Sequence, residues 1–291
     1  MSTDRVPPWA ITVAAMFSVQ LSSSLAVSLI DRVGSGGTAW LRLCMGALLL
    51  LVLARPPLRL VRRQDVPVLL GLGLATGLMT VGLLAAIDRI PLGTAVAIEF
   101  LGPLTVAAVR SHSRQALAWP ALALVGVVLL TEPWHGHVDV VGVVLAIGAG
   151  VAWATYIVLT QHVGDRFHGL GTLSITVPIA AVLATVVGLP QAGGRLTPGV
   201  LAAALGLAVL MPVLPLTLEL LALRRMSPAA FGTLMALEPA FGVLLGAIVL
   251  GQLPTAVQVV GIVLVVVAGA AAQRTGTREP AKDAPLDPLG A

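Results

Sequence analysis

Charged residues, cysteines and aromatic residues are all scarce in this 291-residue chain. Charged residues make up 10% of it, against about 25% in a soluble domain, so a globular protein with a large water-facing surface is excluded. The single cysteine, Cys44, excludes an internal disulfide. No Walker loop, GxSxG elbow or HExxH sequence occurs, which argues against the common nucleotide-binding and hydrolytic enzymes. We therefore expect no metal ion and no other cofactor.

Apolar sequence is what the chain has in abundance. Hydrophobic residues make up 57% of it and the mean hydropathy is +1.00. Runs such as VVGIVLVVVAGAAA do not alternate between apolar and polar residues, which favours helices over the strands of a membrane barrel. We therefore predict an all-α integral membrane protein with ten transmembrane helices. Their approximate limits are 8–30, 36–54, 66–87, 92–110, 116–131, 138–160, 170–188, 198–222, 229–250 and 255–273.

The basic residues predict how these helices are oriented. If the N-terminus is cytoplasmic, thirteen of the seventeen lysine and arginine residues fall in the inner segments, whereas Arg32, Arg89 and Arg195 fall outside and Arg42 lies within the second run. Such a bias predicts that both termini are cytoplasmic. Because the positive charges lie in short loops, we interpret them as a topology signal and expect no nucleic-acid partner.

An internal repeat divides the chain into two halves. Glu99 in GTAVAIEFLGPL and Glu238 in GTLMALEPAFGVLL occupy matching positions, and the glycine, threonine and alanine that precede each of them match at the same shift of 139 residues. Five spans per half make the two halves inverted relative to each other, as in many secondary transporters. We predict a first repeat at 1–131, an outer linker loop at 132–139, a second repeat at 140–273 and a disordered cytoplasmic tail at 274–291.

The two repeated glutamates are the strongest candidates for functional residues. A charge at the centre of a membrane costs roughly 3 kcal/mol on insertion scales, so carboxyl groups there usually face a cavity. Prolines that can kink or open a helix lie close by, Pro103 after Glu99 and Pro239 directly after Glu238. We expect both acids to bind substrate or protons near the midplane. The alternative is that each is a neutral, hydrogen-bonded group that only joins helices.

Other polar and aromatic residues within the runs have two interpretations each. Arg42 could grip a substrate carboxylate or extend to the outer interface. Glu219, which follows Pro215, could line the path or pair with the arginines at 224 and 225. Gln20 could line a cavity or only bond neighbouring helices. The remaining candidates are Thr94 and its repeat mate Thr233 as hydroxyl groups, and Trp153 and Tyr156 as pocket walls or core residues.

At these residues the chain resembles a known family. The segments PLGTAVAIEFLGPL, GAGVAWATYIV and FGTLMALEPAFG are similar to those of the drug/metabolite transporter superfamily, in its EamA branch, and the resemblance extends over residues 8–273. It implies a bacterial inner-membrane protein that exports small metabolites, with amino acids such as threonine or homoserine as expected substrates and the proton gradient as the expected driving force.

These observations predict a secondary exporter that works by alternating access. A zwitterionic amino acid needs both signs of charge, which Glu99, Glu238 and Arg42 supply, and its side-chain hydroxyl needs a neutral partner such as Gln20 or Thr94. The expected partners are this solute, protons and membrane lipid, and the sequence also allows a homodimer. Three alternatives stay open at this point: export of a drug or another metabolite, a membrane-embedded lipid enzyme, and a sensor or scaffold.

Overall fold

The computed structural model describes residues 6–54, 61–110, 117–132, 134, 138–163, 170–223, 225–226, 231 and 234–275. The first half of the chain contributes the helices α1 (Pro8–Val33), α2 (Ser35–Ala54), the short 3-10 helix η3 (Arg63–Asp65), α3 (Val66–Ile87), α4 (Leu92–Arg110) and α5 (Ala118–Thr131). The second half contributes α6 (Val140–Val163), α7 (Leu170–Ala192), α8 (Pro198–Ala208), η6 (Val209–Val213), α9 (Leu214–Leu223), α11 (Glu238–Leu250) and α12 (Ala256–Thr275). All regular structure in these described ranges is helical, as predicted. The predicted tail after residue 275 lies outside them.

The helices have the length and composition of a membrane protein. Seven apolar helices in the described part of the chain are long enough to cross a bilayer. Shorter apolar helices, Ala118–Thr131, Glu238–Leu250 and Ala256–Ala272, lie within the fifth, ninth and tenth predicted spans. At 1.5 Å per residue the 13 residues of α11 cover about 20 Å, less than the roughly 30 Å of a hydrocarbon core. The structure thus confirms a helical multi-pass membrane protein, while its long helices account for seven of the ten predicted spans.

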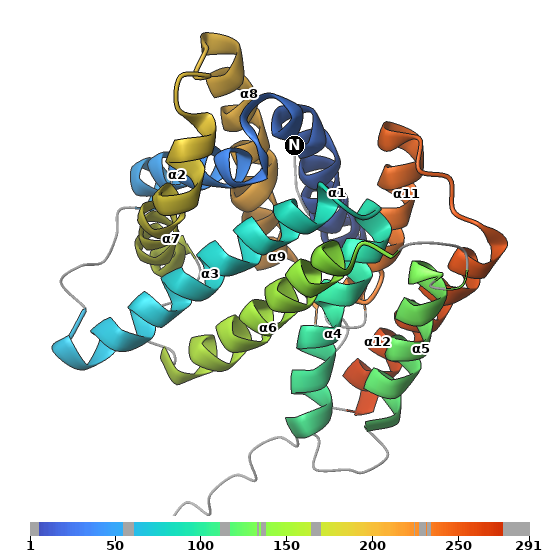
Figure 1. The fold of residues 1–291 in the computed structure, drawn as a ribbon. Coiled ribbons are helices and arrows are strands. Elements are labelled where there is room, and N and C mark those ends of the chain that lie inside the picture. Colours follow the sequence, from blue (N-terminus) through green and yellow to red (C-terminus); the bar gives the residue numbers. More distant parts are fainter. Residues whose placement is uncertain are drawn as a thin grey trace, which may run out of the picture.

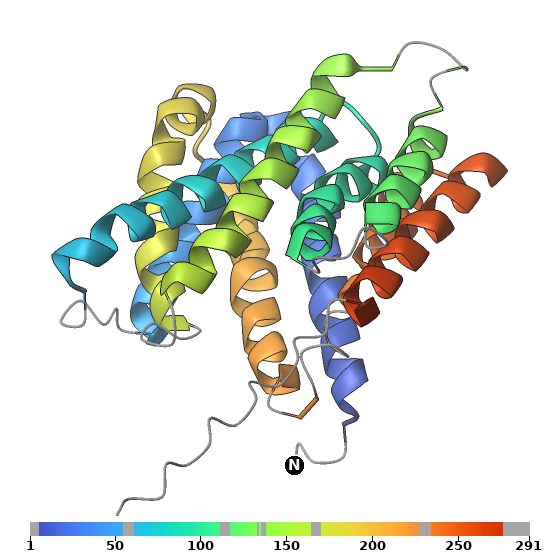
Figure 2. The same cartoon turned by 90° about the horizontal axis from the view of Figure 1, so that it is seen from below.

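Helices from the two halves of the chain pack side by side. Figures 1 and 2 show α3 beside α6 and α5 beside α12, and α2 contacts α7 in the same way. At the crossing of α5 and α12 the close approach is reciprocal. A Cβ atom on Gly126 would lie 2.6 Å from the carbonyl oxygen of Gly261, and one on Gly261 would lie 2.7 Å from that of Gly126. Only glycine fits at either position, because any side chain would strike backbone.

One transmembrane segment is kinked at its centre. α8, η6 and α9 follow one another without a loop, but Met211 has a non-helical backbone (φ −159°, ψ 118°) just before Pro212. The helix opens here because proline has no backbone N–H to donate. Hydroxyl groups of α1 satisfy carbonyl oxygens of this segment, as Ser18 donates to Leu210 at 2.7 Å and Ser22 donates to Leu207 at 3.0 Å. Ser18 and Ser22 therefore bond a neighbouring segment, one of the two roles considered for Gln20 on the same helix, whereas Ser24 and Ser28 donate to carbonyl oxygens of α1 itself.

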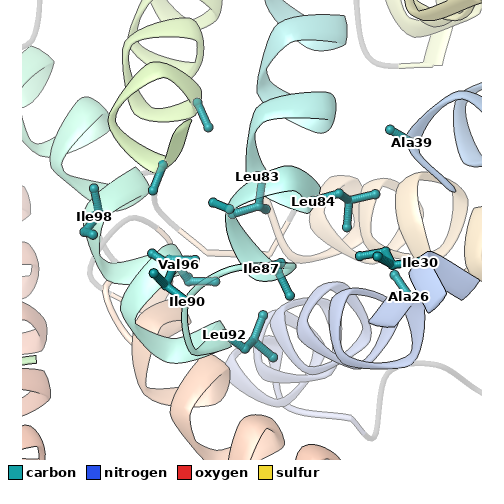
Figure 3. Packing of buried hydrophobic residues seen from close by; sticks show 14 of the residues in the cluster. Ala26, Ile30, Ala39, Leu83, Leu84, Ile87, Ile90, Leu92, Val96 and Ile98 are labelled. Carbon is teal, nitrogen blue, oxygen red and sulfur yellow. The ribbon is translucent and has the colours of Figure 1, made fainter. Parts of the chain in front are cut away.

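The apolar core surrounds α3 and the start of α4. Figure 3 shows side chains of α3 meeting residues of α1, α2 and α4 in one cluster. The labelled members are Ala26, Ile30, Ala39, Leu83, Leu84, Ile87, Ile90, Leu92, Val96 and Ile98. Other large apolar side chains point outward, among them Val52 at 79% exposure and Val186 at 78%. An outer surface of this kind suits contact with lipid rather than water.

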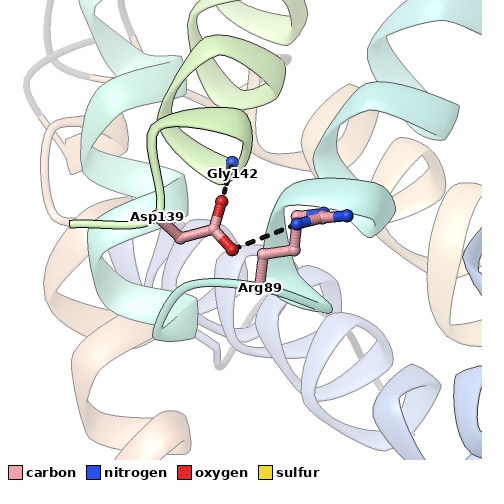
Figure 4. A network of polar contacts seen from close by, with 3 residues as sticks. All are labelled: Arg89, Asp139 and Gly142. Carbon is pink, nitrogen blue, oxygen red and sulfur yellow. Dashed lines mark hydrogen bonds and ion pairs between the residues drawn. The ribbon is translucent and has the colours of Figure 1, made fainter. Parts of the chain in front are cut away.

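Polar contacts join the loops that were predicted to lie outside the membrane. Arg89, after α3, forms an ion pair of 3.1 Å with Asp139, which also accepts a hydrogen bond of 2.8 Å from the backbone N–H of Gly142 (Figure 4). Two of the other three contacts link the first half to the second, and the third links the linker residue Glu132 to the second half. Gln191 accepts from the N–H of Gly36 at 2.8 Å, Gln252 accepts from the N–H of Leu92 at 3.0 Å, and Thr255 donates to Glu132 at 2.9 Å. We call these four links the outer-loop contacts.

Candidate functional site

A cavity of about 300 Å³ lies among helices of both halves, and it brings together most of the predicted site residues. The predicted residues that line it are Gln20, Arg42, Glu99, Trp153, Tyr156, Pro215, Glu219 and Glu238. The other lining residues are Val19, Leu43, Thr76, Met79, Thr80, Leu83, Leu173, Val177, Met211, Pro212 and Met235. Its volume is at the lower end of the range of roughly 300–1,000 Å³ that is typical of small-molecule sites.

Glu238 owes its position to a break in the chain. Residues 236 and 237 form a turn, and α11 starts at Glu238 with Pro239 in its first turn, where the missing N–H costs nothing. The positive end of the helix dipole favours a carboxylate at this place. The side chain is 6% exposed, and its Oε1 accepts a hydrogen bond of 3.4 Å from Nε2 of Gln20 on α1. The repeat mate Glu99 is 5% exposed and close enough to Glu238 for the two carboxyl groups to interact electrostatically.

Glu99 is placed by the tight packing of α4 against α6. A Cβ atom on Gly150 would lie 2.8 Å from the carbonyl oxygen of Glu99, so the absence of a side chain there lets the two helices approach at this level. One residue further on, Phe100 makes an edge-on contact with Trp153, with ring centroids 6.3 Å apart. Trp153 therefore contributes both to the core and to the cavity wall, so it has both of the roles that were considered from the sequence.

Arg42 is the cationic residue among those that line the cavity. It lies on α2 and is 2% exposed, so its guanidinium does not extend to the outer interface. It interacts electrostatically with Glu99, but the structure records no direct ion pair between these two described residues. Its Nη1 is buried and has no hydrogen-bond partner among the described residues. Since buried polar atoms are normally paired, this donor is available to a ligand.

Glu219 and Tyr156 extend the polar lining of the cavity. Glu219 on α9 interacts electrostatically with Glu238 and with Tyr156 on α6. Pro215 stands one turn before Glu219, in the first turn of α9 after the kink. Glu219 is among the residues that line the cavity. Of the two arginines considered as its alternative partners, Arg224 lies outside the described residues and Arg225 lies in the turn after α9.

The remaining predicted site residues do not line the cavity. Thr94 is buried on α4 and is absent from the cavity lining. α4 continues through Pro103, so the helix breaks near the site occur instead before Glu238 and at Met211. Thr233, the repeat mate of Thr94, lies outside the described residues.

Sequence reasoning missed the contributions of α3 and of the kinked segment. Thr76, Met79 and Thr80 of α3 face the cavity, and so do Met211 and Pro212. The signal for the threonines was their spacing of four residues inside an apolar run, which places both hydroxyls on one helix face. The signal for the kink was a proline in the middle of a predicted span.

The arrangement of unpaired groups defines what the cavity can bind. Gln20 Oε1 and Glu238 Oε2 are buried acceptors without a hydrogen-bond partner among the described residues, and Arg42 Nη1 is a buried donor in the same condition. The cavity therefore offers acceptors for an ammonium group and a donor for a carboxylate. Both the ammonium group and the carboxylate of a free amino acid would find hydrogen-bond partners here.

A helical membrane protein whose buried charged side chains surround one internal cavity has the construction of a transporter. Comparison with known proteins gives the family. The sequence model of the EamA-like transporter family matches residues 140–271. The chain is 38% identical, over 286 residues and 96% of both chains, to the threonine/homoserine exporter RhtA of Salmonella typhimurium (strain SL1344). It is also 38% identical, over 285 residues and 96% of both chains, to the exporter of the same name from Escherichia coli K12.

The chain therefore belongs to the EamA-like transporter family of the drug/metabolite transporter superfamily, and it is a multi-pass membrane transporter. This confirms the resemblance noted in the sequence. It is also 28% identical over 163 residues, 52% of each chain, to the uncharacterized transporter YvbV of Bacillus subtilis. One crystal structure at 20% identity covers 90% of this chain and 96% of its own with a TM-score of 0.61, which shows a shared fold.

Proposed function

We propose that the protein is a secondary active exporter of small amino acids of the threonine and homoserine type, driven by protons moving in the opposite direction. The observation that carries this proposal is the cavity in which a buried, unpaired guanidinium nitrogen of Arg42 accompanies unpaired acceptors on Gln20 and Glu238. The 38% identity to the threonine/homoserine exporters supports the same substrate class.

The balance of charge in the cavity supports proton coupling. Three carboxyl groups, those of Glu99, Glu219 and Glu238, share the cavity with the guanidinium of Arg42. An excess of ionised carboxylates in a low-dielectric site is costly, so a cation must compensate it. The ammonium group of a substrate can do so on the outward step, and protons can do so when the empty carrier returns.

Alternating access between two inverted repeats is the motion that we propose. In the repeat, α1 corresponds to α6, α3 corresponds to the segment of α8 and α9, and α4 corresponds to α11. The contacts between the halves follow this correspondence. α3 packs on α6 as α8 and α9 pack on α1, and α4 packs on α6 as α11 packs on α1. The match of the family model to residues 140–271 agrees with a second repeat that starts at residue 140. The outer-loop contacts hold the halves together at one end. We propose that this end faces the periplasm and that both termini are cytoplasmic.

Export of another solute is the second candidate function. A lipophilic cation would need only carboxylates and aromatic walls, and the cavity has both in Glu238, Glu99, Trp153 and Tyr156. It would leave the donor of Arg42 without a partner, which is why we favour the zwitterion. A lipid enzyme and a scaffold are less well supported, because the relatives carry the names of transporters.

A counterflow screen with the purified protein in proteoliposomes tests this function. Vesicles loaded with unlabelled threonine should take up labelled threonine and homoserine faster than vesicles without protein. A lipophilic cation dye should show no such exchange. Exchange of the dye without exchange of any amino acid would replace the amino-acid assignment with the drug-export alternative.

A further inference from the structure

We propose that Thr76 and Thr80 of α3 form a hydroxyl subsite that makes the transporter prefer amino acids with a hydroxyl group in the side chain. The inference rests on the proposed function, because it concerns how the same cavity selects among amino acids. Neither threonine was predicted from the sequence, and the hydroxyl partner expected there, Thr94, does not line the cavity.

The two threonines present a continuous polar strip on α3. They are four residues apart, so their side chains lie one above the other on the same helix face, and both line the cavity. Thr76 is 8% exposed and Thr80 is 4% exposed, so both side chains are buried in the protein. On the same face Leu72 lies one turn before Thr76, and Leu83 lies nearly one turn after Thr80. The strip is thus bounded by apolar side chains at both ends.

The hydrogen bonds of the two hydroxyls determine what each can offer. Thr76 donates its proton to the carbonyl oxygen of Leu72 at 2.8 Å, so it can act only as an acceptor toward a ligand. The structure records no hydrogen bond for the Thr80 hydroxyl with any described residue, which leaves it able to donate and to accept. A substrate hydroxyl is both donor and acceptor, so it can pair with Thr80 in either direction and donate to Thr76.

The other polar lining residues are less suited to a neutral hydroxyl. Arg42, Gln20 and Glu238 are needed for the two charged ends of the amino acid. The hydroxyl of Tyr156 lies beside Glu219, with which it interacts electrostatically, and the indole of Trp153 can only donate. Apolar groups make up much of the rest of the wall, among them Val19, Leu43, Met79, Leu173 and Val177. A substrate hydroxyl directed at these groups would lose its hydrogen bonds to water without replacement.

Selection follows from the cost of unpaired groups. A site built to hydrogen-bond a hydroxyl rejects the analogue that lacks it more strongly than an apolar pocket rejects an added methyl group. An amino acid without a side-chain hydroxyl would leave Thr80 unpaired in a buried site. Replacing Thr80 by valine removes the hydroxyl at nearly constant volume, and it should turn the subsite into an apolar patch that no longer distinguishes the two kinds of substrate.

Competition counterflow in proteoliposomes tests the subsite with full-length protein. Vesicles exchange labelled threonine while unlabelled threonine, homoserine, 2-aminobutyrate or valine competes. 2-Aminobutyrate is the probe because it is threonine, and also homoserine, without the hydroxyl. Wild type should bind the hydroxylated amino acids about tenfold more tightly than 2-aminobutyrate, since one buried hydrogen bond is worth roughly that factor.

The variants are Thr80→Val, Thr80→Ala and Thr76→Val, with Thr80→Ser as the conservative change. Thr80→Val and Thr80→Ala should lower the preference for threonine over 2-aminobutyrate to within about twofold of unity, while 2-aminobutyrate exchange persists. Thr80→Ser should keep the preference, and Thr76→Val should reduce it by less. Thr155→Val is the matched control, because Thr155 is exposed on α6, its hydroxyl is bonded to the carbonyl of Val151 at 2.8 Å, and it does not line this cavity.

Two results would overturn the subsite while the proposed function stands. One is a wild type that exchanges threonine and 2-aminobutyrate equally well. The other is a preference for threonine over 2-aminobutyrate that stays unchanged in Thr80→Ala and also in Thr80→Val or Thr76→Val, whichever of these inserts into the membrane. If wild type exchanged no amino acid at all, the proposed function itself would be wrong, and the subsite with it.

Discussion

Gln20 on α1 donates a hydrogen bond from Nε2 to Oε1 of Glu238 at the start of α11, over 3.4 Å. The contact joins residues 218 positions apart in the chain and comes from opposite halves of the protein. It leaves Gln20 Oε1 and Glu238 Oε2 free as neighbouring acceptors in the cavity. We propose that an ammonium group or a proton takes these acceptors, so that binding is sensed by both halves at once.

We predict that neutralising either repeated glutamate removes most export without preventing insertion. Glu99→Gln and Glu238→Gln keep the size of the side chain but remove its charge, so the substrate ammonium loses a charge-assisted partner worth roughly 1.5–3 kcal/mol. Cells that overproduce each variant should release labelled threonine about tenfold or more slowly than wild type. Asp31→Asn, at the exposed end of α1 and outside the cavity, is the control. Wild-type export by both cavity variants would show that these carboxyl groups are structural.

Arg42 should be required for its geometry as well as its charge. Arg42→Ala removes the donor expected to meet the substrate carboxylate and should weaken the apparent affinity by about 10- to 100-fold. Arg42→Lys keeps the charge but not the two-pronged donor, so its loss should be smaller. Concentration dependence of counterflow gives both values. Equal affinities in wild type, Arg42→Lys and Arg42→Ala would remove this residue from the site.

The glycines at the crossing of α5 and α12 should be intolerant of a side chain. Gly126→Ala and Gly261→Ala would each place a Cβ atom against the backbone of the other helix, and such overpacking costs roughly 1–3 kcal/mol. Both variants should melt below wild type in detergent. Gly206→Ala on α8 is the matched control, because no atom lies within 4 Å of its new Cβ and alanine favours a helix. Equal melting of all three variants would contradict the close packing.

The sequence predicted that Glu99 and Glu238 lie in one cavity, but it predicted the other lining residues less well. Glu99 and Glu238 could be placed together because a repeat with inverted halves brings matching positions toward one axis. Thr94 could not be assigned correctly by the same reasoning. It is five residues before Glu99, which on a helix turns its side chain about 140° away.

Two features depended on tertiary structure that the sequence pattern does not contain. A threonine in an apolar run can bond to its own helix or face a cavity, and the hydropathy of the α3 run is the same in both cases, so only the spacing between Thr76 and Thr80 indicated a shared face. The second half contains several prolines, and the sequence alone does not indicate that the helix is interrupted at Met211 rather than at another of them. The actual break is fixed by the serines of α1 that bond the carbonyls beside it.

Asp139 should stabilise the outer-loop contacts in a pH-dependent way. The backbone N–H of Gly142, and then the guanidinium of Arg89, hold the pKa of Asp139 below its usual range. Its contribution is therefore fully present above the ordinary carboxyl pKa of about 4 and is lost as the pH falls through the lowered value. Asp139→Asn should melt below wild type at pH 7, and the difference should disappear in strong acid. Asp31→Asn, at the exposed end of α1, should show no such loss. A pH-independent difference would assign the effect to packing alone.

Proton-driven movement of an amino acid by the purified protein tests the central claim most directly. Proteoliposomes with an acidic interior and an alkaline exterior should accumulate labelled threonine above its external concentration, because protons leave as the amino acid enters. A protonophore should abolish the accumulation, and vesicles with Glu238→Gln should reach equilibrium at most. Accumulation that is the same with and without the pH gradient, or that persists in Glu238→Gln, would contradict a proton-coupled amino-acid exporter built around this cavity.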